Sequence, residues 1–498
     1  MSLVRKNIAV NLIGSGWVGL VSIAFIPLYI RFMGVEAYGV VGFYITLQSL
    51  FALMDMGLTA TVSRELARLS VSHSNQQKMR NIVRTLELIY WVISLLIMAI
   101  ISFLAPWIAS GWLNASSLPV DTIENAIVLM GIMIALRMPY GFYSGGLVGL
   151  QRQGLLNVIK VIVETLKSAG VVLVLWMVSP TIEVFFQWQL LTGALGVILM
   201  SVALWRSLPG SERASFDKSL LYGIWRFAAG MSASAMLSVV LVQADKVILS
   251  KMLSLQEFGY YMLASTVAMG LYVIVGPVFA AIYPRFSQLV SSGNEKYLIQ
   301  LYHKSSQFMT VLVMPIAIVC CTFSNELLLL WTQDGAVADR AAPILSLLVI
   351  GTALNGMMNV PYALQLANGW TKLVVYMNIV ALIVLIPALF VAVNTLGAIG
   401  GAMIWLALNA GYILFGLVFM HRKILVNEMP RWLISDFGVP VALSGAIILF
   451  GYWLIPDVVM QWQRIIWITV TAVVSVVAAF IAAPLVRKSA VDWIHRGF

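Results

Sequence analysis

Long apolar stretches separated by short polar segments run along the whole chain. Fourteen of them come close to the ~20 residues that an α-helix needs to cross the hydrocarbon core of a bilayer. They lie at about residues 8–30, 38–60, 85–108, 124–148, 155–178, 183–205, 227–250, 258–283, 306–330, 342–366, 371–393, 398–420, 437–455 and 465–486. The pattern predicts an all-α polytopic membrane protein with about 14 transmembrane helices.

Composition supports this class and excludes several others. Hydrophobic residues make up 61% of the 498 and charged residues only 10%, whereas an average soluble domain has about 25% charged residues. The two cysteines, Cys320 and Cys321, are adjacent and offer neither a disulfide framework nor metal-ligand spacing. There is no Walker-type phosphate loop either, so the sequence predicts no cofactor and no built-in ATPase.

The basic residues indicate an orientation in the membrane. Most of the 30 Lys and Arg residues fall in segments that are cytoplasmic if the N-terminus is cytoplasmic, as the positive-inside rule requires. An even number of crossings then places both termini in the cytoplasm. The net charge of +10 therefore reflects topology, and no nucleic-acid partner is predicted. The four histidines also fall in predicted cytoplasmic segments, which argues against a histidine relay at mid-membrane.

A weak internal repeat divides the chain. Leu28–Gly39 matches Ile248–Gly259 with conservative replacements at one constant spacing, and such repeats are common in transporters. Both copies would start from the cytoplasmic side, so the sequence predicts two parallel six-helix lobes related by an axis along the membrane normal. The predicted parts are an N-lobe, a cytoplasmic linker, a C-lobe and a last helix pair with its tail, at residues 1–206, 207–221, 222–425 and 426–498.

Three ionisable residues fall in the middle of predicted helices: Arg137, Glu164 and Lys167. An ionised side chain at the bilayer centre costs about 2.5–3.5 kcal/mol on insertion scales, so such groups face protein or water. We expect a cationic patch in an aqueous cavity that binds an anionic substrate, with Tyr140 on the same helix face as Arg137. The alternative is a structural Glu164–Lys167 ion pair with Arg137 bonded to a backbone carbonyl.

Other polar residues extend the set of candidates. Asn11 belongs to a polar stripe on the first predicted helix, and Asn355 to one on the tenth; both are candidate substrate-binding residues. Asp55 lies near the cytoplasmic end of the second helix. Its position allows a functional role or a carboxylate that is merely solvated.

Several degenerate motifs, in order along the chain, carry a family resemblance. They are Gly34-x-Glu36-x-Tyr38-Gly39, Asp55-Met-Gly-Leu58 followed by Arg64-Glu-Leu-Ala67, Gly149-Leu-Gln-Arg152, and Asp245-Lys246-x-Ile248-Leu249. Together with length and helix count they resemble the polysaccharide transporters of the multidrug/oligosaccharidyl-lipid/polysaccharide exporter superfamily. The likeness covers nearly the whole chain.

The resemblance implies a Wzx-type flippase and not an enzyme. Such a carrier moves undecaprenyl-diphosphate-linked oligosaccharide from the cytoplasmic to the periplasmic leaflet of the bacterial inner membrane by alternating access, for O-antigen, capsule or exopolysaccharide assembly. Its partners would be this lipid-linked substrate, membrane lipids, and the polymerase and chain-length proteins of the pathway. The chemistry and depth of the side chains, and not the resemblance, make Arg137 and Lys167 the candidates to bind the charged part of the substrate, while Glu164 or Asp55 would exchange a proton or a sodium ion.

Two other functions stay open at this point. A cation-coupled drug exporter of the same superfamily would usually have 12 helices, so the last predicted pair argues against it. A membrane polysaccharide polymerase or glycosyltransferase would carry catalytic side chains on sizeable external loops. Here the first outside loop offers Glu36 alone.

Overall fold

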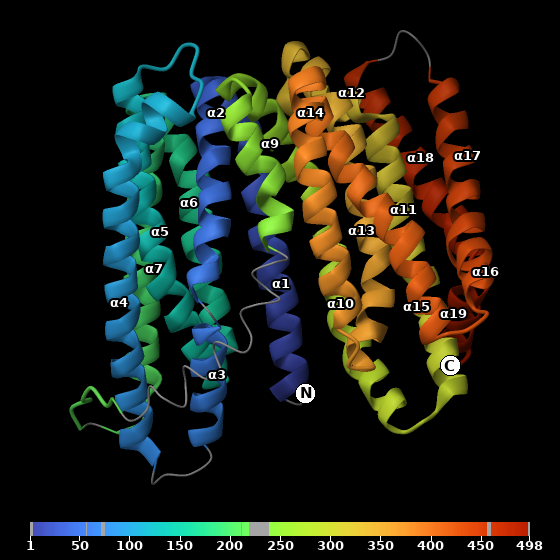
Figure 1. The fold of residues 1–498 in the computed structure, drawn as a ribbon, viewed down its shortest axis with the longest axis horizontal. Helices are drawn as coiled ribbons and strands as arrows, with labels where there is room; N and C mark the ends of the chain where they lie inside the picture. Colours follow the sequence, from blue (N-terminus) through green and yellow to red (C-terminus); the bar gives the residue numbers. More distant parts are fainter. Residues whose placement is uncertain are drawn as a thin grey trace. The chain divides into compact units, whose positions relative to one another are not determined.

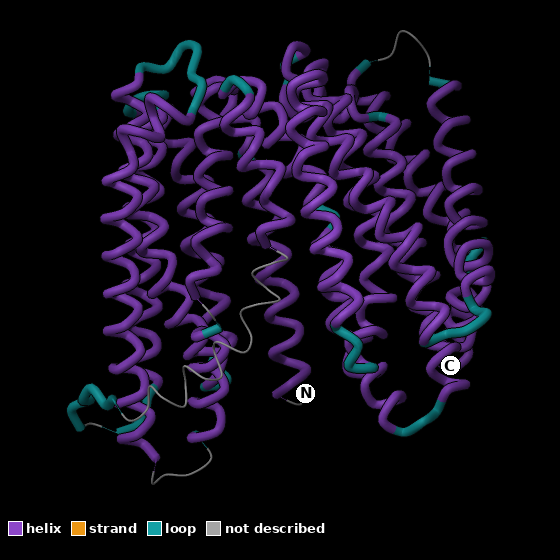
Figure 2. Tube along the Cα trace, in the orientation of Figure 1, coloured by secondary structure: helices purple, strands orange, loops and turns teal. Residues whose placement is uncertain are grey.

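The computed structural model describes residues 3–55, 57–70, 75–210, 212–218, 239–455 and 460–496, without the side chains of residues 3–10, 12–13, 491 and 493–496. Over these ranges the chain is almost entirely helical, and Figure 2 shows helices joined by short loops. No strand forms in the described part of the chain, where Asn114 and Ser254 make one isolated β-bridge. The predicted all-α class is confirmed.

The chain folds as two compact helical units, the first ending at Gly259 and the second beginning at Tyr260. Besides a helix at residues 239–252, the elements of the first unit are α1 (Leu3–Ala24), α2 (Ile26–Phe51), η1 (Ala52–Asp55), α3 (Leu58–Leu69), α4 (Gln76–Trp107), η3 (Ile108–Trp112), α5 (Val120–Gly149), α6 (Gln153–Met177) and α7 (Ile182–Ser207). Helix α5 packs along both α4 and α7, and α6 packs against α1 and α7 (Figure 1).

The second unit begins within α9 (Leu255–Met269). Its further elements are α10 (Tyr272–Ser291), α11 (Glu295–Thr322), α12 (Ser324–Thr332), α13 (Gly335–Ala367), α14 (Lys372–Gly411), η4 (Tyr412–Leu417), α15 (Val418–Lys423), α16 (Met429–Arg431), η5 (Trp432–Gly438), α17 (Val439–Trp453), α18 (Gln461–Ile481) and α19 (Pro484–Arg496). Helix α11 is central to this unit, because it packs against α10, α13, α17 and α18.

Two glycines with non-helical backbone angles interrupt otherwise continuous helices. Gly34 in α2 (φ 84°) and Gly397 in α14 (φ 59°) adopt backbone conformations that L side chains rarely reach. A Cβ on Gly400 would overlap the carbonyl oxygen of Ala392. Residues eight apart in a straight helix are separated by about 12 Å along its axis. Helix α14 therefore doubles back at Gly397.

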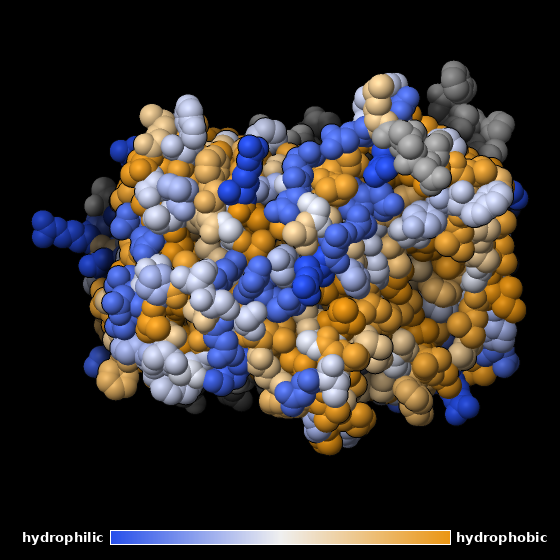
Figure 3. Space-filling view, turned by 90° about the horizontal axis from the view of Figure 1, so that it is seen from above, coloured by the Kyte–Doolittle hydropathy of each residue, from blue (hydrophilic) through white to orange (hydrophobic). Residues whose placement is uncertain are grey.

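Ten helical segments of the described chain are long and apolar enough to cross a membrane. They are Ile26–Asp55, Gln76–Trp112, Val120–Gly149, Ile182–Ser207, Leu255–Ser291, Glu295–Thr322, Gly335–Ala367, Lys372–Lys423, Met429–Trp453 and Gln461–Ile481. The chain is thus a multi-pass membrane protein. Large apolar side chains such as Phe103 and Trp176 are exposed, as lipid contact requires. Figure 3 looks onto the ends of the helices, where polar and apolar residues are mixed.

The difference from fourteen predicted helices has identifiable sources. The predicted helices 371–393 and 398–420 are both contained in the stretch Lys372–Lys423, which reverses at Gly397. Helix α6 has 25 residues but carries three charged side chains. The described apolar part of α1 is short, and the predicted helix 227–250 lies partly outside the described residues. The count of fourteen, the lobe boundaries and the side of the termini stay predictions.

The repeated stretches meet inside the first unit. A Cβ on Gly39 would overlap the carbonyl oxygen of Leu255, and a Cβ on Gly259 would overlap that of Val35. These two contacts are related by the repeat, since Val35 corresponds to Leu255 as Gly39 does to Gly259. The absence of side chains at both glycines thus lets the two backbones touch reciprocally.

Candidate functional site

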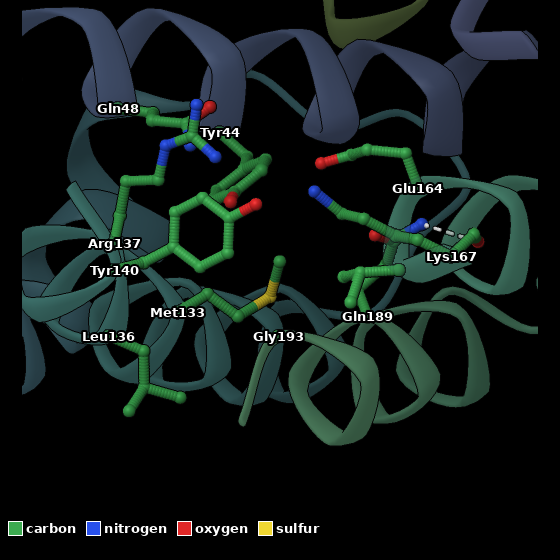
Figure 4. A pocket seen from close by; sticks show the side chains of 11 residues that line it. Tyr44, Gln48, Met133, Leu136, Arg137, Tyr140, Glu164, Lys167, Gln189 and Gly193 are labelled. Atoms are coloured by element: carbon green, nitrogen blue, oxygen red, sulfur yellow. Dashed lines mark hydrogen bonds between the residues drawn. The ribbon is translucent and has the colours of Figure 1, made fainter. Parts of the chain in front are cut away.

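A cavity that opens to solvent lies among α2, α5, α6 and α7 of the first unit (Figure 4). The space inside it, including open solvent, is about 430 Å³. Its lining combines charged, polar and apolar side chains: Tyr44, Gln48, Met133, Leu136, Arg137, Tyr140, Val163, Glu164, Lys167, Gln189 and Gly193.

Helix α5 contributes Arg137 and Tyr140, one turn apart on the same face. The guanidinium carbon of Arg137 lies 5.5 Å from the centre of the Tyr140 ring, a cation–π contact. Arg137 itself is exposed, so its five N–H groups remain available to a bound anion. The Tyr140 ring also lies close to Gly196 of α7, where an added Cβ would be 3.3 Å from the ring.

Helix α6 contributes Glu164 and Lys167, whose side chains point into the same cavity as those of Arg137 and Tyr140 (Figure 4). Within the described chain no ion pair shorter than 4.0 Å joins Glu164 to Lys167 or to Arg137. With all three ionised the cavity carries one net positive charge. Water is partly excluded there, which strengthens its attraction for an anion.

Sequence reasoning missed the contributions of α2 and α7. Tyr44 and Gln48 come from α2, spaced by one turn, and Gln189 and Gly193 come from α7 in the same way. The buried Gln189 places its Nε2 3.4 Å from the carbonyl oxygen of Lys167. The four-residue spacing in the sequence shows that each pair shares one face of its helix. It does not show that these two faces pack toward α6.

Asn11 lies at the interface of α1 and α6 and outside the cavity lining. Its Nδ2 donates to Gln153 Oε1 at 2.8 Å, and its Oδ1 accepts from Asn157 Nδ2 at 2.5 Å. Asn157 is buried and also donates to the Gln153 carbonyl. These contacts tie two helices together, and nothing in them points toward a substrate.

Asp55 also lies apart from the cavity. Its Oδ1 accepts hydrogen bonds from the hydroxyls of Thr59 and Tyr90, each at 2.5 Å. The carboxylate thereby connects η1 to the first turn of α3 and to α4. This geometry suits a positioning role, and the proton or sodium exchange predicted for Asp55 stays a prediction.

Asn355 belongs to the second unit. It accepts from the Tyr272 hydroxyl at 2.7 Å and donates to Asn409 Oδ1 at 2.7 Å, which links α10, α13 and α14. Glu36, the acid of the first predicted outside loop, accepts hydrogen bonds from the backbone N–H groups of Ser116 and Ser117. Within the described ranges no three His, Cys, Asp or Glu side chains converge to hold a metal ion.

Two solved structures with a similar fold are named as a flippase and a multidrug transporter. The chain resembles "Lipid II flippase MurJ, inward closed conformation" with a TM-score of 0.70 and 12% sequence identity, over 97% of this chain and 100% of that one. It resembles the inward-facing conformation of a multidrug resistance MATE family transporter of the MOP superfamily with a TM-score of 0.67 and 13% identity, over 82% and 94% of the two chains.

Sequence comparisons identify the family. The chain is 24% identical over 412 residues to a Shigella flexneri protein named "Putative O-antigen transporter", which covers 81% of this chain and 94% of that protein. A model described as MatE matches residues 231–391. A model described as polysaccharide biosynthesis protein matches residues 4–290. Since this last match spans more than half of the 498 residues, the chain belongs to the polysaccharide biosynthesis protein family.

Proposed function

We propose that this protein is a flippase that moves undecaprenyl-diphosphate-linked oligosaccharide from the cytoplasmic to the periplasmic leaflet by alternating access. The observation that carries the proposal is the cationic cavity of Arg137 and Lys167 in a chain of the polysaccharide biosynthesis family. The name of the Shigella flexneri relative and the fold shared with a lipid II flippase support it.

The chemistry of the cavity suits a diphosphate. A guanidinium can give two parallel N–H bonds to one phosphate, while an ammonium acts as a compact charge. Arg137 and Lys167 are on neighbouring helices and face the same space, so both contribute positive charge where a diphosphate would bind. Tyr140 holds the guanidinium from one side and leaves its edge to the substrate.

Glu164 is suited to reset the cycle. When ionised, its carboxylate competes with an anionic substrate for Lys167 and Arg137 in the same cavity. Uptake of a proton or a sodium ion would remove that competition and favour binding. Loss of the ion would favour release. Asp55 is the second candidate for this exchange, although two hydroxyls already bond its carboxylate.

The remaining parts of the proposal concern the whole carrier. Residues 1–206 and 222–425 would form the two moving lobes, and residues 426–498 would supply the extra helix pair and a cytoplasmic C-terminus. The polymerase and chain-length proteins of surface-polysaccharide assembly would act on the delivered substrate.

The test replaces each cation separately. In a strain that lacks its own copy of the gene, Arg137→Ala and Lys167→Ala should abolish surface polysaccharide while leaving the amount of membrane-inserted protein unchanged. Arg152→Ala and Lys78→Ala are matched controls, because both residues are exposed and lie outside the cavity lining. Full complementation by both cavity variants would overturn the assignment of the site.

A drug exporter is the second candidate, favoured by the MatE match at residues 231–391 and the multidrug transporter fold. The same strain, tested against a panel of cationic drugs, separates the two. A flippase restores surface polymer without raising resistance. Broad resistance without restored polymer would establish the exporter instead.

A further inference from the structure

A buried cluster of titratable side chains joins several segments of the second unit. His303 lies on α11, Asp436 on η5, and Glu428 directly before α16. The side chains of His303 and Asp436 are 0% exposed, and that of Glu428 is 24% exposed. The proposed transport cavity belongs to the other unit and uses none of them.

Both ring nitrogens of His303 face a carboxylate. Nδ1 is hydrogen bonded to Oδ2 of Asp436, and Nε2 lies 2.8 Å from Oε2 of Glu428. The other oxygen of Asp436 accepts from Nε2 of Gln307 at 2.9 Å. Gln307 in turn accepts from the backbone N–H of Leu485 on α19 at 2.9 Å. The imidazole thus anchors a chain of contacts from α16 and η5 through α11 to α19.

This arrangement requires one proton more than a neutral imidazole and two ionised carboxylates carry together. A neutral imidazole has a single N–H, and its other nitrogen can only accept. An ionised carboxylate can also only accept, so two hydrogen bonds from one imidazole to two carboxylates need both nitrogens protonated. The extra proton belongs on the ring, since an imidazole is a stronger base than a carboxylate.

We propose that the His303–Asp436–Glu428 cluster is a binding site for one exchangeable proton, which fastens the segment directly before α16 to α11 when it is bound. Without it, a ring lone pair would face a carboxylate oxygen inside the protein, where an unmade hydrogen bond is costly. Glu428 is the partly exposed member and gives the proton its route to solvent.

The neighbouring titratable and charged side chains have contacts that do not require this proton. His421 on α15 bonds the Leu417 carbonyl through Nδ1 and faces the Tyr302 hydroxyl through Nε2, at 3.3 Å, so a neutral ring satisfies both contacts. Arg431 on α16 lies 3.8 Å from Glu428. Arg487 on α19 donates to a backbone carbonyl.

The sign of the pH effect follows. The bound proton stabilises the folded protein, so this stabilisation is present at low pH and is lost as the pH rises. We expect the thermal midpoint of the purified full-length protein to fall by about 2–4 °C when the pH is raised until the proton is lost, as expected for one weakened hydrogen bond in a unit of this size.

The decisive variant is Glu428→Gln. The new amide can donate to Nε2 of a neutral imidazole, so it replaces the proton by a permanent N–H and should abolish the fall. Glu295→Gln is the matched control, an exposed carboxylate on α11 that should keep the fall. An equal fall in wild type and Glu428→Gln would overturn the proposal.

A second measurement reads the proton directly in the wild-type protein, and a variant serves only to assign the signals. The chain has four histidines, so ¹⁵N-histidine NMR gives few signals, and those missing in His303→Gln are assigned to His303. We expect two N–H groups on this ring below the pH at which the thermal midpoint falls and one N–H group above it. A single N–H at every pH would refute the site. Neither measurement involves transport, so failure here leaves the proposed flippase untouched.

Discussion

At the scale of single residues, the cavity shows how a charged side chain is accommodated inside a membrane protein. Arg137 lies over the ring of Tyr140 and opens to a shared space with Glu164 and Lys167. Each contact lowers the free-energy cost of burying the Arg137 guanidinium and leaves its positive charge in place. The site can therefore stay cationic and empty of internal ion pairs, which is the state that an anionic substrate needs.

Tyr140 offers a test of this view. Tyr140→Phe keeps the ring beneath the guanidinium and should retain most of the surface polysaccharide made by the wild type. Tyr140→Ala removes a contact worth about 0.5–2 kcal/mol and should reduce transport by roughly two- to thirty-fold. The measurement is the rate of surface-polymer formation at matched protein level. A loss in Tyr140→Phe equal to that in Tyr140→Ala would show that the hydroxyl, not the ring, matters.

At the scale of elements, small residues let helices approach each other, and ion pairs stabilise single helices. Gly39 and Gly259 allow reciprocal backbone contacts between the two repeated stretches. Glu65 pairs with Arg64 at 2.8 Å and with Arg68 at 2.6 Å, all three on the short helix α3. The sequence showed that both glycines recur, but only the folded backbone shows that they touch.

Replacing either glycine by alanine should disturb this contact. Gly39→Ala and Gly259→Ala each force a methyl group against a carbonyl oxygen, and overpacking of this kind typically costs about 1–3 kcal/mol. The thermal midpoint in detergent should fall for both. Gly16→Ala on α1 is the control, because its Cβ would meet nothing within 4 Å and a helix gains stability from alanine. Unchanged midpoints in both variants would contradict the reciprocal contact.

Glu65 predicts an acid dependence. Burial alone would raise the pKa of Glu65, but hydrogen bonds from Arg64 and Arg68 outweigh it and lower the pKa below its usual value. The ionised form thus adds stability above the ordinary carboxylate pKa, about 4.3, and this is lost as pH falls through the lower folded value.

The thermal midpoint of the wild type should therefore exceed that of Glu65→Gln at neutral pH. The difference between the two midpoints, called the gap below, should disappear below about pH 4. Glu212→Gln, an exposed acid, should show no such gap. A gap that is constant with pH would mean that the carboxylate charge contributes nothing.

At the scale of the whole molecule, two statements made from the sequence are established. The family resemblance is confirmed by a family model that matches more than half of the chain, and the all-helical multi-pass class by ten apolar helices in the described residues. The substrate itself remains proposed, since fold likeness at 12–13% identity shows the fold alone. The cavity chemistry, and not the fold, is what favours a diphosphate.

The sequence by itself determined that this protein crosses a membrane many times, because apolar length and the scarcity of charge leave no soluble alternative. It also singled out Arg137, Glu164 and Lys167. Placing a charge at membrane depth costs free energy, so charged residues are rare in apolar stretches and are easily recognised in the sequence. Only the tertiary structure decided that these three share a cavity with Tyr44 and Gln189, while Asn11, Asp55 and Asn355 bond to other partners. It alone revealed His303 between two carboxylates, because residues more than a hundred positions apart meet through packing that no local pattern records.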